Sequence, residues 1–170
     1  FYSQPIKNRD IEIIGKKAVK AFDTRSRFFH FEFFRLDEDK EGLGKKGDIV
    51  GLEVNMRAPG AYMPDMANFA YDVDVYTIWA DMLIYDKCYY DIERKYWVAY
   101  TGRRDGFGYA HNYDQIRATY GDAIALEADV PEVLSAAMGN HVFIMRAKTQ
   151  DELFDMIRYV LKREDGTDWM

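Results

Sequence analysis

The fold is decided by two short stretches, FHFEFF at Phe29–Phe34 and GLEVNMRAPG at Gly51–Gly60. Their aromatic and β-branched residues predict two strands, over residues 27–36 and 49–57. The segment between them, residues 37–48, is polar and contains three glycines, which is typical of an exposed connection. We therefore expect an antiparallel hairpin with a long loop.

Both predicted strands carry polar residues at positions that strand alternation makes informative, because alternate side chains share a face. In the second strand the rule gives an apolar face and a polar face. The apolar face carries Val50, Leu52, Val54 and Met56, and the polar face carries Glu53, Asn55 and Arg57. In the first strand it places Glu32 on an apolar face with Phe28, His30 and Phe34. Solvation alone does not explain an acid in such a row.

A hairpin that is symmetric about residues 41–43 places Glu32 opposite Glu53, with Asn55 beside both. Facing carboxylates repel one another unless a cation lies between them. Carboxylate and amide oxygens suit Mg²⁺ or Mn²⁺, which keep further positions for water and phosphate oxygens. Arg57, one pleat further on, can hold a phosphate with its guanidinium. A solvated polar face is the alternative interpretation, and the residues alone leave both open.

With the helix predicted over residues 11–22, these strands resemble the C-terminal half of an ATP-grasp domain, in the group of biotin carboxylase and the carbamoyl phosphate synthetase large chain. The resemblance covers residues 6–85, including a helix expected over residues 72–85. It implies an α+β fold, an antiparallel sheet with flanking helices. We expect the ATP-grasp C-terminal lobe at residues 1–85 and a small α/β extension packed on it at residues 86–170.

The resemblance also implies roles for individual residues. Glu32, Glu53 and Asn55 match the family's ligands for the Mg²⁺ (or Mn²⁺) ions that bridge the phosphates of ATP. Arg57 matches a basic residue that contacts the substrate or the transferred phosphate, and it is the predicted catalytic residue. The implied activity is that of an ATP-dependent carboxylate ligase, which activates a small carboxylate as an acyl phosphate for attack by an amine or a similar nucleophile.

Parts of the ATP-grasp pattern are missing from the sequence. The family's earlier lobe brings a glycine-rich loop and phosphate-binding lysines, which we do not find, and the chain begins with Phe1 rather than Met. We therefore expect a fragment that needs the N-terminal lobe of the same protein and does not turn over ATP alone. Two alternatives remain: a non-catalytic, ATP-grasp-derived binding or scaffolding module, and an unrelated α+β domain with an acidic hairpin.

The remaining elements follow from apolar spacing and helix-end signals. Helices are predicted over residues 8–23, 114–120 and 132–138, and strands over residues 95–103, 123–128 and 141–147. A capping box, Thr149 with Glu152, begins the final helix. Its apolar stripe, Leu153, Met156, Ile157, Val160 and Leu161, belongs either to the core or to an interface.

Composition limits the class of protein. The 170 residues are 48% hydrophobic and 16% aromatic, enough to build a core without disulfides. The single Cys88 lies among tyrosines and is expected to be packed, in a reducing compartment. A net charge of −6 argues against nucleic acid or an anionic membrane as partners, and no apolar run reaches 18 residues. A cytoplasmic location follows as an expectation, and a homo-oligomer stays open.

Two further signals carry less information. The segment Gly102–Gly108 is either a mobile loop that presents Arg103 or Arg104 to an anionic substrate or a tight turn with solvated charges. The three histidines lack the spacing of a zinc site. His30 shares the face of Glu32 and is expected to be a packed residue.

Overall fold

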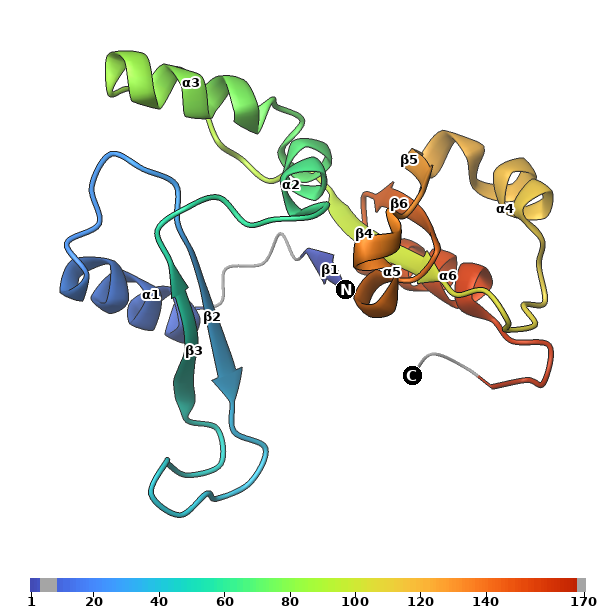
Figure 1. Ribbon diagram of the computed structural model, residues 1–170, viewed down its shortest axis with the longest axis horizontal. Coiled ribbons are helices and arrows are strands. Elements are labelled where there is room, and N and C mark those ends of the chain that lie inside the picture. The colour runs from blue at the N-terminus through green and yellow to red at the C-terminus, as the bar shows by residue number, and fades with distance from the viewer. Residues whose placement is uncertain (4–8, 168–170) are drawn as a thin grey trace. The chain divides into compact units, whose positions relative to one another are not determined.

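The computed structural model describes residues 1–3 and 9–167, which form an α+β structure (Figure 1). This confirms the predicted α+β class, and the ATP-grasp assignment stays a prediction. The chain divides into two compact units. Unit 1 comprises residues 1–5, 61–73 and 91–170, and unit 2 comprises residues 6–60 and 74–90. The predicted domain boundary near residue 86 stays a prediction. In the division into compact units, residues 61–73 belong to the same unit as residues 91–170.

Unit 1 is built on an antiparallel sheet with strand order β1-β4-β6-β5. The strands are β1 (Tyr2–Ser3), β4 (Trp97–Arg103), β5 (Ile124–Asp129) and β6 (His141–Ala147). The helices are α2 (Met63–Tyr71), α4 (Tyr113–Tyr120), α5 (Glu132–Met138) and α6 (Gln150–Leu161), with a 3₁₀ turn at Gly121–Ala123. The three longer strands and helices α4, α5 and α6 lie close to their predicted ranges.

Alternation along β4 and β6 divides the core between the two faces of the sheet. Val98, Tyr100, Val142 and Ile144 pack against α2, with α5 alongside. The intervening residues of both strands, among them Ala99, Phe143 and Met145, pack against α4 and α6. Both strands are buried on both faces, which explains why they are almost continuously apolar in sequence.

Helix α6 begins as its sequence signals predict. The Thr149 hydroxyl accepts from the Glu152 N–H, and the Glu152 carboxylate accepts from the Thr149 N–H, so the capping box is formed. Leu153, Ile157 and Val160 of the stripe are buried in the core of unit 1. The choice between core and interface is therefore settled in favour of the core.

Unit 2 contains α1 (Arg9–Ala21), the hairpin of β2 (His30–Arg35) and β3 (Ile49–Asn55), and α3 (Val75–Tyr85). The predicted start of the first helix, Asn8, lies outside the described residues. Both strands are shorter than predicted, and α3 begins after its cap Asp74 rather than at Asp72. Among the described residues of this unit, only Leu36 and Ile78 are buried hydrophobics.

The hairpin contains an irregularity that strict alternation does not foresee. Strand pairing shifts between Glu32 and Phe33, so that Leu52 is the extra residue of a β-bulge. Beyond the bulge Val50 pairs with Phe34, on the face of Glu32, whereas Val54 pairs with Phe31 on the other face. The predicted single apolar face of the second strand is therefore wrong.

Two other expectations are corrected. Helix α2 was not predicted, although Pro64 near its start is a recognised signal for a helix beginning. Cys88 is exposed rather than packed among tyrosines. Among the helices that the structure describes, none is long and apolar enough to cross a membrane.

Candidate functional site

The acidic pair of the hairpin lies as the sequence predicts. Glu32 and Glu53 are direct cross-strand partners in the β2–β3 ladder, so their side chains leave the same face. The predicted pairing is confirmed. Both residues are exposed, which corrects the expectation that Glu32 is enclosed in an apolar row. Water therefore screens part of their mutual repulsion.

Asn55 and His30 are paired on the same face and complete a small polar cluster. The Asn55 Nδ2 group donates to the Glu53 carboxylate and lies 3.0 Å from His30 Nε2. His30 Nδ1 lies 3.1 Å from the carbonyl oxygen of Arg57. The contacts fit a histidine that donates through Nδ1 and accepts through Nε2. His30 is thus a hydrogen-bonded member of the cluster rather than a residue packed only by apolar contact.

Arg57 follows β3 in a bend. Its Nη1 group donates to the carbonyl oxygen of Ala58 at 2.9 Å, and the side chain is exposed. The structure thus leaves the guanidinium mostly in solvent. Its predicted contact with substrate or phosphate stays a prediction.

The cluster offers a divalent cation a partial coordination shell. The Asn55 amide nitrogen is engaged by Glu53, so its oxygen remains as a possible ligand beside two carboxylates. Within residues 1–3 and 9–167 no group of three or more His, Cys, Asp or Glu side chains forms a metal cage. The two carboxylates and the Asn55 oxygen suit Mg²⁺, which typically binds one or two carboxylates and takes its other ligands from water and phosphate.

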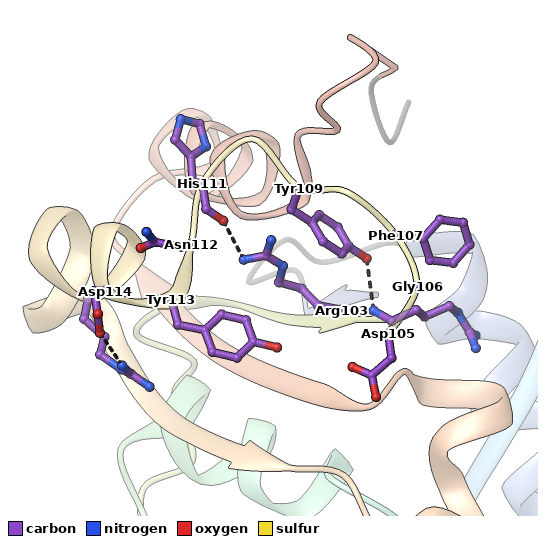
Figure 2. Close-up of a pocket in the computed structure, with 11 residues that line it drawn as sticks. Arg103, Asp105, Gly106, Phe107, Tyr109, His111, Asn112, Tyr113 and Asp114 are labelled. Carbon is purple, nitrogen blue, oxygen red and sulfur yellow. Dashed lines mark hydrogen bonds and ion pairs between the residues drawn. The ribbon is translucent and has the colours of Figure 1, made fainter.

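A second candidate site is a pocket of about 680 Å³ that lies wholly in unit 1 (Figure 2). It is formed by the end of β4, the loop after it and the start of α4. Its lining is basic and aromatic, with Arg103, Arg104, Arg117, Phe107, Tyr109 and Tyr113 among its residues. A pocket of this size is within the range of small-molecule sites.

Arg103 is the buried cation of this pocket, with only 5% of its surface exposed. Its Nη1 group donates to the His111 carbonyl oxygen at 2.8 Å, while the buried Nε has no hydrogen-bond partner among the described residues. The guanidinium carbon lies 3.8 Å from the centre of the Tyr109 ring and 5.1 Å from that of Tyr113. Burial lowers the pKa of Arg103 from its usual value, and the two tyrosines partly offset this effect.

The backbone around Arg103 is fixed by close packing against the end of α5. Arg103 is the last residue of β4, and its carbonyl oxygen accepts from the Asn140 N–H at 2.7 Å. Gly139 has φ of +91°, and a Cβ there would lie 2.7 Å from that same carbonyl oxygen. The absence of a side chain at Gly139 therefore allows the approach that holds Arg103 in place.

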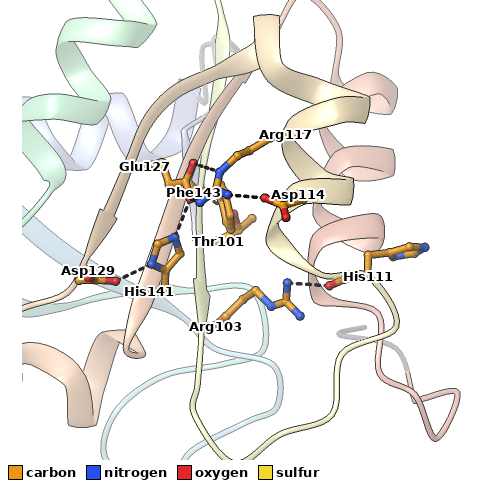
Figure 3. A network of polar contacts seen from close by, with 9 residues as sticks. All are labelled: Thr101, Arg103, His111, Asp114, Arg117, Glu127, Asp129, His141 and Phe143. Atoms are coloured by element: carbon orange, nitrogen blue, oxygen red, sulfur yellow. Dashed lines mark hydrogen bonds and ion pairs between the residues drawn. The ribbon is translucent and has the colours of Figure 1, made fainter.

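A polar network beside the pocket neutralises Arg117 (Figure 3). The Glu127 carboxylate accepts from Arg117 at 2.6 Å and lies 3.0 Å from His141 Nε2. Asp114 also binds Arg117, at 2.7 Å, and His141 Nδ1 lies 2.7 Å from Asp129. Side-chain hydrogen bonding from Arg117 is the largest cause that lowers the pKa of Glu127.

The sequence pointed to only part of this pocket. Arg103 and Arg104 are predicted to lie in a mobile loop or in a turn with solvated charges, and both interpretations are wrong for Arg103, which is the buried last residue of β4. Tyr109, Tyr113 and the pair Glu127–His141 were not singled out. The basic and aromatic alternation of residues 103–113 is the signal that was available for the two tyrosines.

The chain was compared with protein-family models, curated proteins and solved structures, and none of the three comparisons finds a match. The resemblance to ATP-grasp domains therefore depends on the residues of the hairpin and its neighbours.

Proposed function

We propose that this chain supplies the metal-binding lobe of an ATP-grasp carboxylate ligase. In this proposal Glu32, Glu53 and Asn55 bind Mg²⁺ (or Mn²⁺) together with ATP, and Arg57 contacts the phosphoryl group that is transferred. The observation that carries the proposal is the direct cross-strand pairing of Glu32 with Glu53. If the pairing of β2 with β3 were shifted by one residue at this point, the two carboxylates would lie on opposite faces of the hairpin and could not share an ion.

Each residue of the cluster has a distinct part in this function. The two carboxylates hold negative charge at one point of the β2–β3 ladder, and Asn55 is oriented by its bonds to Glu53 and His30. A bound divalent cation supplies charge neutralisation for the phosphates of the nucleotide. Arg57 is exposed just beyond the strand, and its guanidinium can turn toward an anionic group by exchanging its hydrogen bond to the Ala58 carbonyl oxygen. The proposed reaction joins a carboxylate to an amine or similar nucleophile through an acyl phosphate.

A titration of the full chain with Mn²⁺, followed by electron paramagnetic resonance with and without ATP, tests the metal site. The variant Glu53→Gln keeps the size of the side chain and removes its charge. We expect it to weaken Mn²⁺ binding by about tenfold or more, because even the loss of a residue that only hydrogen-bonds to a metal ligand lowers metal affinity by that much.

Glu41→Gln is the matched control, because Glu41 is an exposed acid in the loop of the same hairpin. It should bind Mn²⁺ like the original chain. Equal affinity in all three proteins refutes the metal site. Turnover of ATP to ADP by the 170-residue chain alone refutes the expectation that a second lobe is needed.

A non-catalytic binding module is the second candidate function. It is favoured by the apolar surface that α3 exposes, with Leu83 at 66% and Ile84 at 68%. The two candidates differ in what Glu53→Gln does within a complete protein. An enzyme must lose its ligase activity, whereas a scaffold must keep its partner.

A further inference from the structure

The three arginines that line the pocket of unit 1 differ in how their charges are satisfied. Arg117 is bound by the carboxylates of Asp114 and Glu127. Arg104 donates to the carbonyl oxygens of Ser135 and Ala137 in the last turn of α5, where the helix dipole is negative. Arg103 has no carboxylate within 4.0 Å among the described residues, although it is the most deeply buried of the three.

A buried charge without a counter-charge is costly, so native structures generally pair it. The faces of Tyr109 and Tyr113 and the His111 carbonyl stabilise the Arg103 guanidinium only in part. In Figure 2 the guanidinium lies between the two tyrosine rings, at the centre of the residues that line the pocket. A ligand in the pocket therefore meets a cation that is already desolvated and held in position.

We infer that this pocket binds a small organic monoanion, a carboxylate on a flat apolar body, with Arg103 as its counter-ion. The pocket lies in unit 1 alone, so the inference does not depend on the function proposed for the hairpin.

The net charge of the lining residues favours a ligand that carries a single negative charge. Three arginines and two aspartates line the pocket, which leaves one positive charge in excess. Asp105 is one of these aspartates, and its carboxylate repels a second negative charge on a ligand in the pocket. A carboxylate matches this balance, whereas a phosphate dianion exceeds it.

The aromatic lining selects the rest of the ligand. Tyr109 and Tyr113 flank Arg103, and the half-exposed Phe107 forms part of the wall. Burial raises the pKa of Tyr113, whose hydroxyl is protonated near neutral pH even at its ordinary pKa and can donate a hydrogen bond. One face of Phe107 is covered by Arg163 and one face of Tyr113 by His141, so a planar apolar body gains its contact area from the ring edges and the remaining faces.

The test is calorimetric titration of the full chain with benzoate, benzamide and inorganic phosphate at constant ionic strength. Benzamide has the shape of benzoate without its charge. We expect benzoate to bind with a Kd of about 1 mM, as suits a ligand of this size, and benzamide at least about tenfold more weakly. Phosphate should also bind more weakly than benzoate.

Arg103→Met retains an unbranched apolar side chain and removes the charge. It should weaken benzoate binding by at least about tenfold. Arg158→Met is the control, because Arg158 lies outside this pocket and pairs with Asp155 on the surface of α6. It should bind benzoate like the original chain.

Four outcomes overturn the inference: no binding of benzoate, benzamide as tight as benzoate, phosphate tighter than benzoate, or unchanged binding by Arg103→Met. If Arg103→Met does not fold, the comparison of benzoate with benzamide in the original chain still decides whether charge determines binding.

Discussion

The backbone of Gly102 lies directly against the carbonyl group of Met138. A Cβ on Gly102 would overlap the Met138 oxygen and would lie 2.9 Å from Cε1 of Tyr100. The Tyr100 hydroxyl donates to that same Met138 carbonyl at 3.0 Å. The end of β4 and the end of α5 are thus held together at the position that precedes Arg103.

Gly102→Ala tests this close approach. The added methyl group forces β4 and α5 apart, and we expect a loss of about 3 kcal/mol in the free energy of unfolding. Urea denaturation followed by circular dichroism measures it. Gly121→Ala is the matched control, because Gly121 has helical φ and ψ and a Cβ there would meet no atom within 4 Å. Equal midpoints for the two variants contradict the prediction.

The capping box of α6 is tested by Thr149→Ala. The variant removes the acceptor for the Glu152 N–H, and N-cap losses of this kind cost about 1 kcal/mol. Thr119→Ala is the control, since Thr119 is an exposed residue within α4 whose hydroxyl bonds to the Gln115 carbonyl. The urea midpoint should fall for Thr149→Ala and change little for Thr119→Ala. The reverse order means that the cap does not stabilise the helix.

Much of the fold could be predicted because local signals coincide with the final structure. Hairpin symmetry about residues 41–43 predicts the cross-strand pairing of Glu32 with Glu53, but in the structure the bulge at Leu52 is what brings Glu53 opposite Glu32. The shift beyond Glu32 could not be predicted in this way, because a bulge is set by how the strands twist and pack rather than by alternation. The capping box at Thr149 is read from sequence because both partners are three residues apart.

The unit 1 pocket was harder to predict, although its lining residues lie close together in sequence, between Arg103 and Arg117. Their arrangement also depends on distant segments, since Asn140, 37 positions after Arg103, donates to the Arg103 backbone carbonyl. Glu127 and His141 come together through the pairing of β5 with β6. No local sequence pattern predicts such contacts. The sequence shows only that residues 103–113 are rich in basic and aromatic residues.

Glu32→Gln tests whether the acidic pair of the hairpin is adapted to a cation. In the presence of a chelator the variant should be more stable by a few tenths of a kcal/mol, because like charges directly opposite destabilise a ladder. Added Mn²⁺ should stabilise the original chain and reverse this order. Glu41→Gln should respond to Mn²⁺ like the original chain. Equal stabilisation of Glu32→Gln by Mn²⁺ shows that the pair does not bind the ion.

Acid denaturation tests the network around Glu127. The hydrogen bonds from Arg117 and His141 lower the pKa of the Glu127 carboxyl below its ordinary value of 4.5. A group whose pKa is lowered by folding adds stability above its unfolded pKa, and that stability is lost as pH falls through the folded pKa. Between about pH 6 and pH 3, the urea midpoint of the original chain should therefore fall more than that of Glu127→Gln. Asp114→Asn is the control: Asp114 also binds Arg117, but its side chain is 89% exposed, so this variant should follow the original chain. Parallel curves for Glu127→Gln and the original chain mean that the Glu127 contacts add no pH-dependent stability.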